Sequence, residues 1–402
     1  MRASRRDPSR SPALFSLLAP GLAALPLLAG ATPAVAQDCG FGDLDPTFAI
    51  TEVVGGDSMN GVDVLPDGRA YAALQIDSPT VEAHFTVSRT LADGTLDPSF
   101  AAGGVLSLDL LGSDDSWAND VEVTADGGAV AVGAAWDAFG TDEILGVLLR
   151  VTADGQLDSS FGTDGMVLVP GGGYCELNEV EVLADGRIVV AGLVIPGSPG
   201  PDLTIMRFHP DGSPDASYGT AGAVLHDVVA SPDYDEIAIG ADGSVAVASP
   251  AFSTVSLFDS NGQLDPSFGV GGRVEITQSS FYLIKTLAID ADGGVVVGGL
   301  HLIPSNAELM ALRLLADGSL DTSWGSGGTW IGPEAYEPWE FDGIAADGEG
   351  GHYLVVSLMT PSVRTALVHM LPGGAPAGEP AIAASSPKLR VSPGGISRAA
   401  CS

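Results

Sequence analysis

The sequence predicts an all-β fold, and two observations lead to that class. First, a two-part phrase returns six times along the 402 residues: Asp-Gly-x-Leu-Asp-x-Ser-Phe-Gly, and about 25 residues later a second Asp-Gly between two short apolar runs. From Gly68 to Gly348 the second Asp-Gly recurs over 280 residues in five intervals, a period of 56. Second, the segments between these turn signals are short and apolar, and they lack the helical period. Periods of this size are typical of solenoids, propellers and arrays.

Each repeat is expected to hold four antiparallel strands. In the second repeat we place them at residues 105–110, 120–124, 129–134 and 145–152. The Asp-Gly between the second and third strands predicts a tight hairpin, because Gly takes a positive φ there. In the longer phrase, Asp and Ser can bond neighbouring backbone while Leu and Phe fold inward as a small apolar plug. Six repeats of four strands predict a six-bladed β-propeller over residues 37–375.

The two ends of the repeat region predict that the propeller closes into a ring. The first copy of the phrase, Gly42–Phe48, lacks the strand that precedes the phrase elsewhere. The chain supplies such a strand at its far end, at residues 366–371. We therefore expect a strand near Phe48–Val54 to be the outer strand of the last blade, so that the N-terminal and C-terminal segments pair.

One cationic position belongs to this frame. It lies four residues before the first Asp-Gly of a unit, and its occupants are Arg89, Arg150, Arg207, Leu257, Arg313 and His369. Four arginines at one register of a chain with few cations imply a repeated role. The expected role is an ion pair with an Asp of the Leu-Asp turn.

These motifs resemble the delta-60 repeat family. The pattern Leu-x-x-Asp-Gly-x-Leu-Asp-x-Ser-Phe-Gly-x-x-Gly, followed by an acidic loop and Asp-Gly-Arg/Lys-Ile-x-Val-x-Gly, covers residues 41–374, and the copies that begin at Asp211 and Asn261 depart from it at single positions. The resemblance implies a propeller-like extracellular domain of an exported bacterial protein. The family provides no catalytic residues to carry over.

The two termini differ from the repeats. Residues 1–36 combine a basic start, an apolar stretch from Ala13 to Ala31 and a small-x-small end at Ala36, which is typical of a secretory signal peptide. We expect cleavage near Ala36, a secreted, periplasmic or cell-surface protein, and no membrane span. Residues 376–402 are rich in Pro, Ala and Ser and predict a disordered tail.

Charge and cysteine content restrict the partners. Removing residues 1–36 takes away four Arg and Asp7, which leaves 12 basic and 50 acidic residues, or −38. Such a surface repels nucleic acid and anionic membranes, so partners should be neutral, cationic or bridged by a divalent metal. Cys39, Cys175 and Cys401 leave the disulfide pairing open, and we expect a monomer.

The connections that vary between repeats are expected on one face of the propeller. Variable loops on a rigid frame commonly carry binding. The candidate ligand-face residues are Asp114, Asp115, Trp117, Tyr174, Tyr234, Tyr336 and Trp339. They favour a non-enzymatic binding or adhesion module for a glycan or a protein at the cell surface. A scaffold without its own ligand is a further reading.

An alternative is a divalent-metal-dependent hydrolase or lactonase. Polar residues are expected at the mouth of each innermost strand, where they could hold a ligand, a cation or only water: Asn60, Asn119, Asn178, Asp235, Lys285 and Glu340. Among them, Asn119, Asn178, Asp235 and Glu340 are the candidate metal ligands, and calcium is the candidate ion. The six histidines lie at different registers and no nucleophile elbow is visible, so neither catalytic residues nor an organic cofactor are expected.

Overall fold

The fold was analysed on a computed structural model of the chain. It describes residues 58–75, 84–111, 115–137, 143–195, 202–227, 236–249, 253–276, 281–303, 306–332, 338–346, 351–358, 364–370 and 381–382. The predicted signal peptide and the predicted strand at Phe48–Val54 lie outside these residues. Over the described ranges the secondary structure is strands and turns, without a helix, so the predicted all-β class is confirmed.

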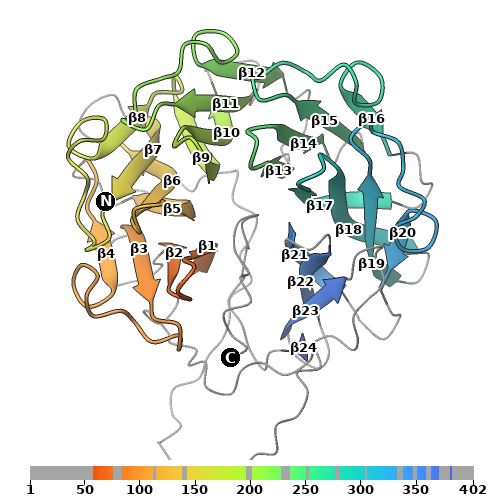
Figure 1. Ribbon diagram of the computed structural model, residues 1–402, viewed down its shortest axis with the longest axis horizontal. Coiled ribbons are helices and arrows are strands. Elements are labelled where there is room, and N and C mark those ends of the chain that lie inside the picture. Colours follow the sequence, from red (N-terminus) through yellow and green to blue (C-terminus); the bar gives the residue numbers. More distant parts are fainter. Residues whose placement is uncertain are drawn as a thin grey trace, which may run out of the picture. The chain divides into compact units, whose positions relative to one another are not determined.

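The described strands form runs of four antiparallel neighbours in chain order, which we number 1 to 6 (Figure 1). Runs 1 to 3 contain β1 (Ser58–Val64), β2 (Ala70–Gln75), β3 (Phe85–Thr90), β4 (Val105–Leu108), β5 (Ser116–Val123), β6 (Ala129–Trp136), β7 (Ile144–Val151), β8 (Met166–Val169), β9 (Tyr174–Val182), β10 (Ile188–Ile195), β11 (Asp202–Phe208) and β12 (Ala223–Asp227). Runs 4 to 6 contain β13 (Glu236–Ile239), β14 (Val245–Ser249), β15 (Thr254–Phe258), β16 (Arg273–Glu275), β17 (Phe281–Ile289), β18 (Val295–Ile303), β19 (Asn306–Leu314), β20 (Thr329–Ile331), β21 (Pro338–Ala346), β22 (His352–Leu358), β23 (Arg364–Met370) and β24 (Ala381–Ile382).

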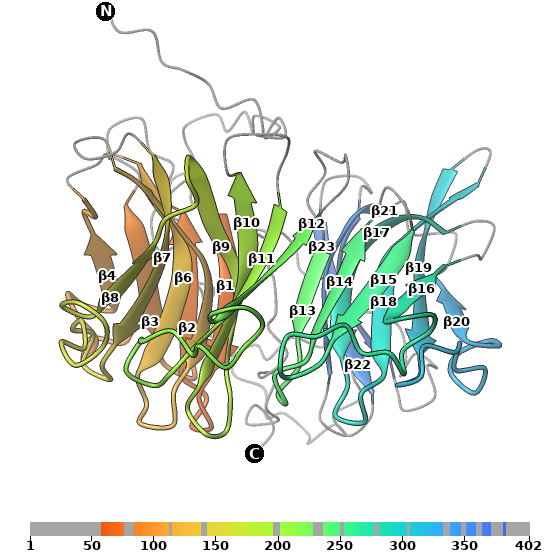
Figure 2. The same cartoon turned by 90° about the horizontal axis from the view of Figure 1, so that it is seen from above.

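Successive runs pack against each other through their first strands. The series of contacts proceeds from β1 to β5, β9, β13, β17 and β21 (Figures 1 and 2). Runs 2 and 3 are also joined into one eight-stranded sheet, because Ile144 of β7 pairs in parallel with Tyr174 of β9. The predicted closure of this series involves Phe48–Val54, outside the described residues.

The outer edge of run 6 differs from the prediction. Over Ala366 and Leu367 of β23, the outer position is occupied by β24, which pairs with these two residues. Ala381 and Ile382 belong to the segment 376–402, for which the sequence predicts a disordered tail. The physical reason for the pairing is that an uncovered edge strand presents N–H and C=O groups that a returning chain can satisfy.

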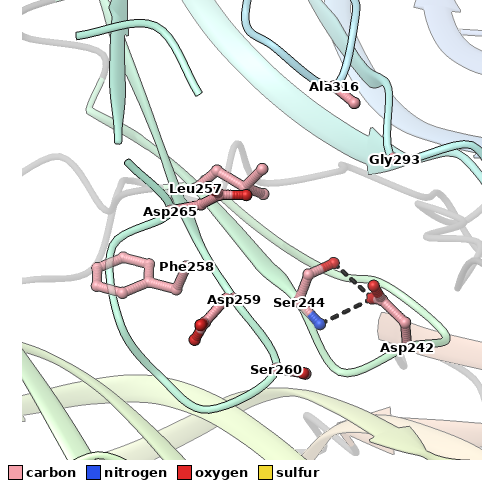
Figure 3. A pocket seen from close by; sticks show the side chains of 9 residues that line it. All are labelled: Asp242, Ser244, Leu257, Phe258, Asp259, Ser260, Asp265, Gly293 and Ala316. Atoms are coloured by element: carbon pink, nitrogen blue, oxygen red, sulfur yellow. Dashed lines mark hydrogen bonds between the residues drawn. The ribbon is translucent and has the colours of Figure 1, made fainter. Parts of the chain in front are cut away.

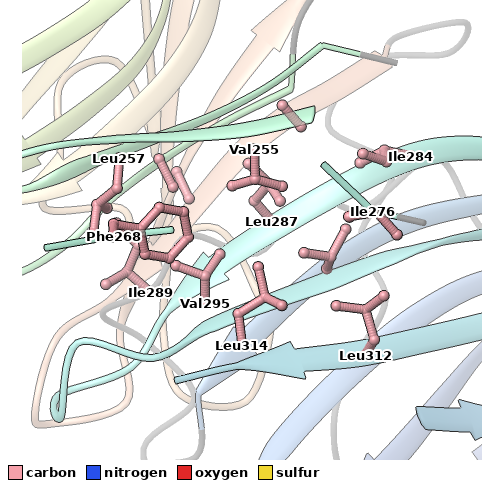
Figure 4. Close-up of a cluster of buried hydrophobic side chains, with 14 of the residues drawn as sticks. Val255, Leu257, Phe268, Ile276, Ile284, Leu287, Ile289, Val295, Leu312 and Leu314 are labelled. Carbon is pink, nitrogen blue, oxygen red and sulfur yellow. The ribbon is translucent and has the colours of Figure 1, made fainter. Parts of the chain in front are cut away.

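The apolar core lies between runs. Each of five clusters draws its residues from two successive runs. In the cluster between runs 4 and 5, Val255 and Phe268 face Leu287, Val295 and Leu314 (Figure 4). Strands covered on both faces lose the polar alternation of a half-exposed strand. In β6, accordingly, every residue from Ala129 to Ala135 is buried.

The longer phrase of the repeat folds as a turn with an apolar plug. Its aromatic residue is fully or almost fully buried in Phe100, Phe161, Tyr218, Phe268 and Trp324. Within the turn, Ser99 donates both its N–H and its hydroxyl to Asp97 Oδ1, at 2.9 and 2.6 Å. The leucine of the phrase is partly buried in Leu96, Leu157, Leu264 and Leu320. The aromatic part of the predicted plug and the predicted backbone-binding role of Asp and Ser are confirmed.

This turn also fastens each run to the next one. The N–H of the residue after the aromatic donates to the carbonyl of the Asp or Asn that begins the next copy of the phrase. These bonds are Ala101 to Asp154 at 3.0 Å, Gly162 to Asp211 at 2.8 Å, Gly219 to Asn261 at 2.9 Å and Gly269 to Asp317 at 2.8 Å. The clasp, as we call this bond, therefore recurs at four successive boundaries.

The arginine column has the predicted partner. Arg89 Nε and Arg207 Nε donate to Oδ2 of Asp97 and Asp215, at 2.9 and 2.8 Å. In the other two cases Arg150 Nε lies 3.3 Å from Asp158 Oδ2, and Arg313 Nη1 lies 2.6 Å from Asp321 Oδ2. The predicted ion pair between the arginine column and the Leu-Asp turn is confirmed.

Candidate ligand-binding face

Four polar and aromatic side chains meet at one end of runs 2 and 3. Glu176 of β9 is the common acceptor. Its Oε1 accepts from Trp117 Nε1 at 2.8 Å and from Asn119 Nδ2 at 3.0 Å, and its Oε2 accepts from the Tyr174 hydroxyl. We call Trp117, Asn119, Tyr174 and Glu176 the Glu176 cluster. All four side chains are half-buried, so the cluster has both fixed and solvent-facing atoms.

Strand geometry explains this convergence. Alternate residues of a strand point to the same side, so Trp117 and Asn119 share one side of β5, and Tyr174 and Glu176 share one side of β9. The register of β5 against β6 shifts between Ala118 and Asp120, which makes Asn119 a bulge and re-aims its side chain. The parallel pairing of β7 with β9 then holds both strands in the same sheet.

A close backbone approach precedes the cluster. Gly171 lies beside the start of β9, and a Cβ at this position would lie 2.1 Å from the Tyr174 carbonyl oxygen. Only a glycine can fit there without displacing the strand. Gly171 therefore helps to fix the place at which Tyr174 enters the sheet.

Trp136 is a residue of this end that the sequence-based prediction missed. It is the last residue of β6 and pairs with Ile144, which in turn pairs with Tyr174. The residue is 37% exposed, which places it among the exposed large apolar residues of the described ranges. The sequence carried a signal for it, because an aromatic residue ends the apolar run 129–136 next to a variable connection.

The predicted ligand-face residues thus have different outcomes. Trp117 and Tyr174 are brought together by Glu176, which the sequence places in the same loop without singling it out. Asp115 is exposed just before β5. The remaining candidates are Asp114, Tyr234 and Tyr336, which lie outside the described residues, and Trp339, which lies on β21 with its side chain outside the description.

Four of the six predicted polar positions of the inner strands are sites of β-bulges. Register shifts place Asn60, Asn119, Asn178 and Lys285 at such bulges. Asn60 Nδ2 donates to the Ala118 carbonyl at 2.8 Å, and Asn119 Nδ2 donates to the Leu177 carbonyl at 2.9 Å. These two amides therefore link the first strand of one run to the first strand of the next.

Of the four predicted metal ligands, Asn119 and Asn178 have described side chains. The amide nitrogen of Asn119 is used in the Glu176 cluster and in the bond to Leu177. Asp235 and the side chain of Glu340 lie outside the described residues, so the predicted site as a whole stays a prediction. Within the described ranges, no three His, Cys, Asp or Glu side chains are grouped so as to hold a metal ion.

A set of buried carboxyl groups lies further along the same first strands. Asp63, Glu122 and Glu181 share one register on β1, β5 and β9, and Asp120 lies next to them. The Asp63 carboxylate accepts from the N–H groups of Val64 and Val123 at 2.7 and 2.9 Å. Asp120 Oδ2 accepts from the Val180 N–H at 3.0 Å. Asp63 and Asp120 thus bind backbone of the neighbouring run.

Burial shifts the protonation of this set. Glu122 and Glu181 are each 6% exposed, and one carboxyl oxygen of each has no hydrogen-bond partner. Burial raises the pKa of Glu122 well above its usual range, and the charges of Asp63 and Glu181 raise it further. Burial, with a contribution from Asp63, raises the pKa of Glu181 to about 8. At neutral pH Glu181 therefore holds a proton that an exposed glutamate would have lost.

Cys175 lies between the two members of the cluster on β9 and points to the other side. It is a free, fully buried thiol, and burial raises its pKa to about 12. Cys39 and Cys401 lie outside the described residues.

Comparisons with known proteins agree with the fold class. Residues 183–218 match the model of a domain of unknown function, DUF5122, described as a β-propeller. This segment includes β10, β11 and one copy of the longer phrase up to Tyr218. The chain therefore contains a β-propeller-type repeat. No curated protein matches the chain.

Three solved structures with detectable similarity are distant from this chain. Virginiamycin B lyase from Staphylococcus aureus is 10% identical, with 82% of this chain and 86% of that chain covered and a TM-score of 0.45. A calcium-binding protein, regucalcin, from Agrobacterium tumefaciens is 11% identical, with 84% and 92% covered and a TM-score of 0.37. The PQQ-bound aldose sugar dehydrogenase from Streptomyces coelicolor is 15% identical, with 68% and 87% covered and a TM-score of 0.37.

The described part of the chain contains no helix that is long and apolar enough to cross a membrane.

Proposed function

We propose that this protein is an exported binding module without enzymatic activity, which recognises a cell-surface glycan through the Glu176 cluster. The observation that carries the proposal is the convergence of Trp117, Asn119 and Tyr174 on one carboxylate. Aromatic rings offer flat apolar faces to the C–H groups of a sugar, while carboxylate and amide oxygens accept from its hydroxyl groups. Since the rings are held by Glu176, little side-chain freedom is lost on binding.

The proposed frame of this module is a six-bladed ring. Five successive contacts between first strands, from β1 to β21, support it. The recurrent clasp supports a common geometry at the four boundaries from run 1 to run 5. In this proposal, the chain near Phe48–Val54 pairs with β23 beyond Ala366 and Leu367, the two residues that β24 covers, and this pairing closes the ring after removal of the signal peptide.

The test is a glycan array probed with the mature protein, followed by binding titrations with a glycan that the array retains. Trp117→Ala and Tyr174→Ala should each weaken binding about fivefold or more, because a stacked ring contributes about 1 kcal/mol or more. Leu225→Ala is the matched control, since Leu225 is an exposed apolar residue on the outer strand β12, away from the cluster.

Two outcomes would contradict the proposal. Unchanged glycan binding in the Trp117→Ala, Tyr174→Ala double variant would exclude the Glu176 cluster as the site. If no glycan on the array binds and the parent, but not the double variant, captures one surface protein, the ligand is that protein rather than a glycan. The melting temperature of each variant should stay close to that of the parent, which separates lost binding from lost folding.

A further inference from the structure

A cavity of about 180 Å³ lies at the other end of the strands, where the tight turns of run 4 approach run 5. Its wall is formed mainly by Asp242, Ser244, Leu257, Asp259, Asp265 and Ala316 (Figure 3). Drug-sized ligands occupy about 300–1,000 Å³. The cavity is therefore of a size for the head group of a side chain.

In the sister runs this place is filled by an arginine. Leu257 occupies the register of the arginine column, and Asp265 corresponds to Asp97 of run 1 and Asp215 of run 3. The guanidinium groups of Arg89 and Arg207 are buried there, each with Nε on the Oδ2 atom of its Asp. A leucine side chain is too short to reach the position of the guanidinium group, so the volume of that group is unfilled in run 4.

The remaining contacts of the guanidinium also have counterparts around the cavity. Arg89 Nη1 donates to the Ala153 carbonyl, and Arg207 Nη1 donates to the Ser260 carbonyl. Each acceptor immediately precedes the first Asp-Gly or Asn-Gly of the next repeat. The residue at that place for run 4 is Ala316, which lines the cavity. The Asp of the turn and the residue that supplies the carbonyl in the sister runs thus both line the cavity, while the arginine that binds them there is replaced by Leu257.

Run 4 also lacks the second arginine of this region. Arg69 in run 1 and Arg187 in run 3 follow the second Asp-Gly, and each lies within 4.0 Å of the Asp of the turn. Ser244 stands at this position in run 4. Asp265 Oδ1 and Asp242 Oδ1 accept from Ser267 and Ser244. Among the ion pairs between described residues, none includes Asp242, Asp259 or Asp265.

We propose that this cavity binds the guanidinium group of an arginine side chain supplied by a partner protein. The guest group would repeat the contacts of Arg89 and Arg207, with Asp265 Oδ2 and the Ala316 carbonyl as acceptors. A planar guanidinium presents several donors in a fixed fork, which suits this pair of acceptors better than the point charge of an ammonium group. The partner is accordingly a basic protein, complementary to an acidic chain.

The first experiment titrates the mature protein with Nα-acetyl-arginine amide at physiological salt, followed by calorimetry or chemical-shift changes. Asp265→Asn should bind this probe at least about tenfold more weakly, since one charge-assisted hydrogen bond is lost. Asp93→Asn removes the same charge from an exposed turn of run 1 and should bind as the parent does. This control separates a local contact from the general attraction of an acidic surface.

The second experiment supplies the missing group in the chain itself. Leu257→Arg should fill the cavity with a tethered guanidinium, raise the melting temperature and abolish binding of the probe. Equal binding of the probe to the parent and to Leu257→Arg would overturn the proposal. So would equal affinity for Nα-acetyl-lysine amide, or tighter binding of calcium than of the arginine probe. If Leu257→Arg does not fold, unchanged binding by Asp265→Asn decides against the site.

Discussion

The buried arginine pairs provide the sharpest test of how the repeat is stabilised. We consider Arg207→Leu, which copies into run 3 the residue that run 4 has at this register. The side chains of Arg207 and Asp215 are 4% and 7% exposed, with 2.8 Å between Nε and Oδ2. Arg207 also stacks over Tyr218 at 4.8 Å and bonds the Ser260 carbonyl. Leucine retains much of the apolar stem but none of these polar contacts.

The expected loss follows from burial. Removing one partner of a buried ion pair typically costs about 3–5 kcal/mol. In Arg207→Leu, Asp215 would keep only the more distant Arg187 Nη1, at 3.9 Å. Arg150 at the same register is the matched control, because its side chain is 21% exposed and its partners Asp158 and Asp126 are 20% and 62% exposed. An exposed pair contributes about 0–1 kcal/mol. Arg207→Leu should therefore lose about 2–5 kcal/mol more unfolding free energy than Arg150→Leu.

The assay is urea unfolding of the parent and both variants, monitored by tryptophan fluorescence and by circular dichroism. Arg207→Leu combined with Asp215→Asn should recover part of the loss, because the weakly paired charge of Asp215 disappears. Equal destabilisation by Arg207→Leu and Arg150→Leu would refute the reasoning, since burial would then not determine the contribution of the pair.

Three further predictions concern other parts of the fold. Because the pKa of Glu181 is raised in the folded state, its contribution to stability is fully present below about pH 4.3 and is lost as the pH rises through about 8. Glu181→Gln should therefore reduce the fall of the melting temperature between pH 5 and 9. An unchanged dependence of the melting temperature on pH would contradict this prediction. The buried Cys175 thiol should react with a thiol reagent only after unfolding, so rapid labelling of the folded protein would place it at the surface. Truncation after residue 365 should lower soluble yield and melting temperature far more than truncation after residue 374, because both remove β24 but only the first also removes most of β23. Equal losses would argue against the packing of run 6.

Local, repeated chemistry made much of the fold predictable. The turn with Asp97, Ser99 and Phe100 depends on residues within one short phrase, and its recurrence marks the same feature in each unit. The pairing of Arg89 with Asp97 was predictable for a related reason, because a cation that recurs at one register requires a recurring partner. Strand positions followed from the same turn signals.

The candidate site was less predictable because it depends on contacts between repeats. Trp117 and Glu176 are 59 residues apart, and only the packing of β5 against β9 brings them together. In so acidic a sequence, Glu122 and Glu181 would be expected at the surface. Their position at the same register of successive first strands was nevertheless a visible signal. Leu257 was recognised as an exception to the arginine column, but a sequence does not show that its neighbours leave a cavity.

The clasp has a consequence for how such a chain can change. Because the aromatic turn of one repeat bonds to the first Asp or Asn of the following repeat, the determinants of each boundary are divided between two copies of the phrase. A single repeat cut out of the chain would lack the partner residues of the clasp on each of its two sides. Duplication of a whole 56-residue repeat, in contrast, would reproduce a complete boundary on each side. Gene duplication in units of one repeat is thus compatible with this architecture, while the loops at the opposite end are left to diverge.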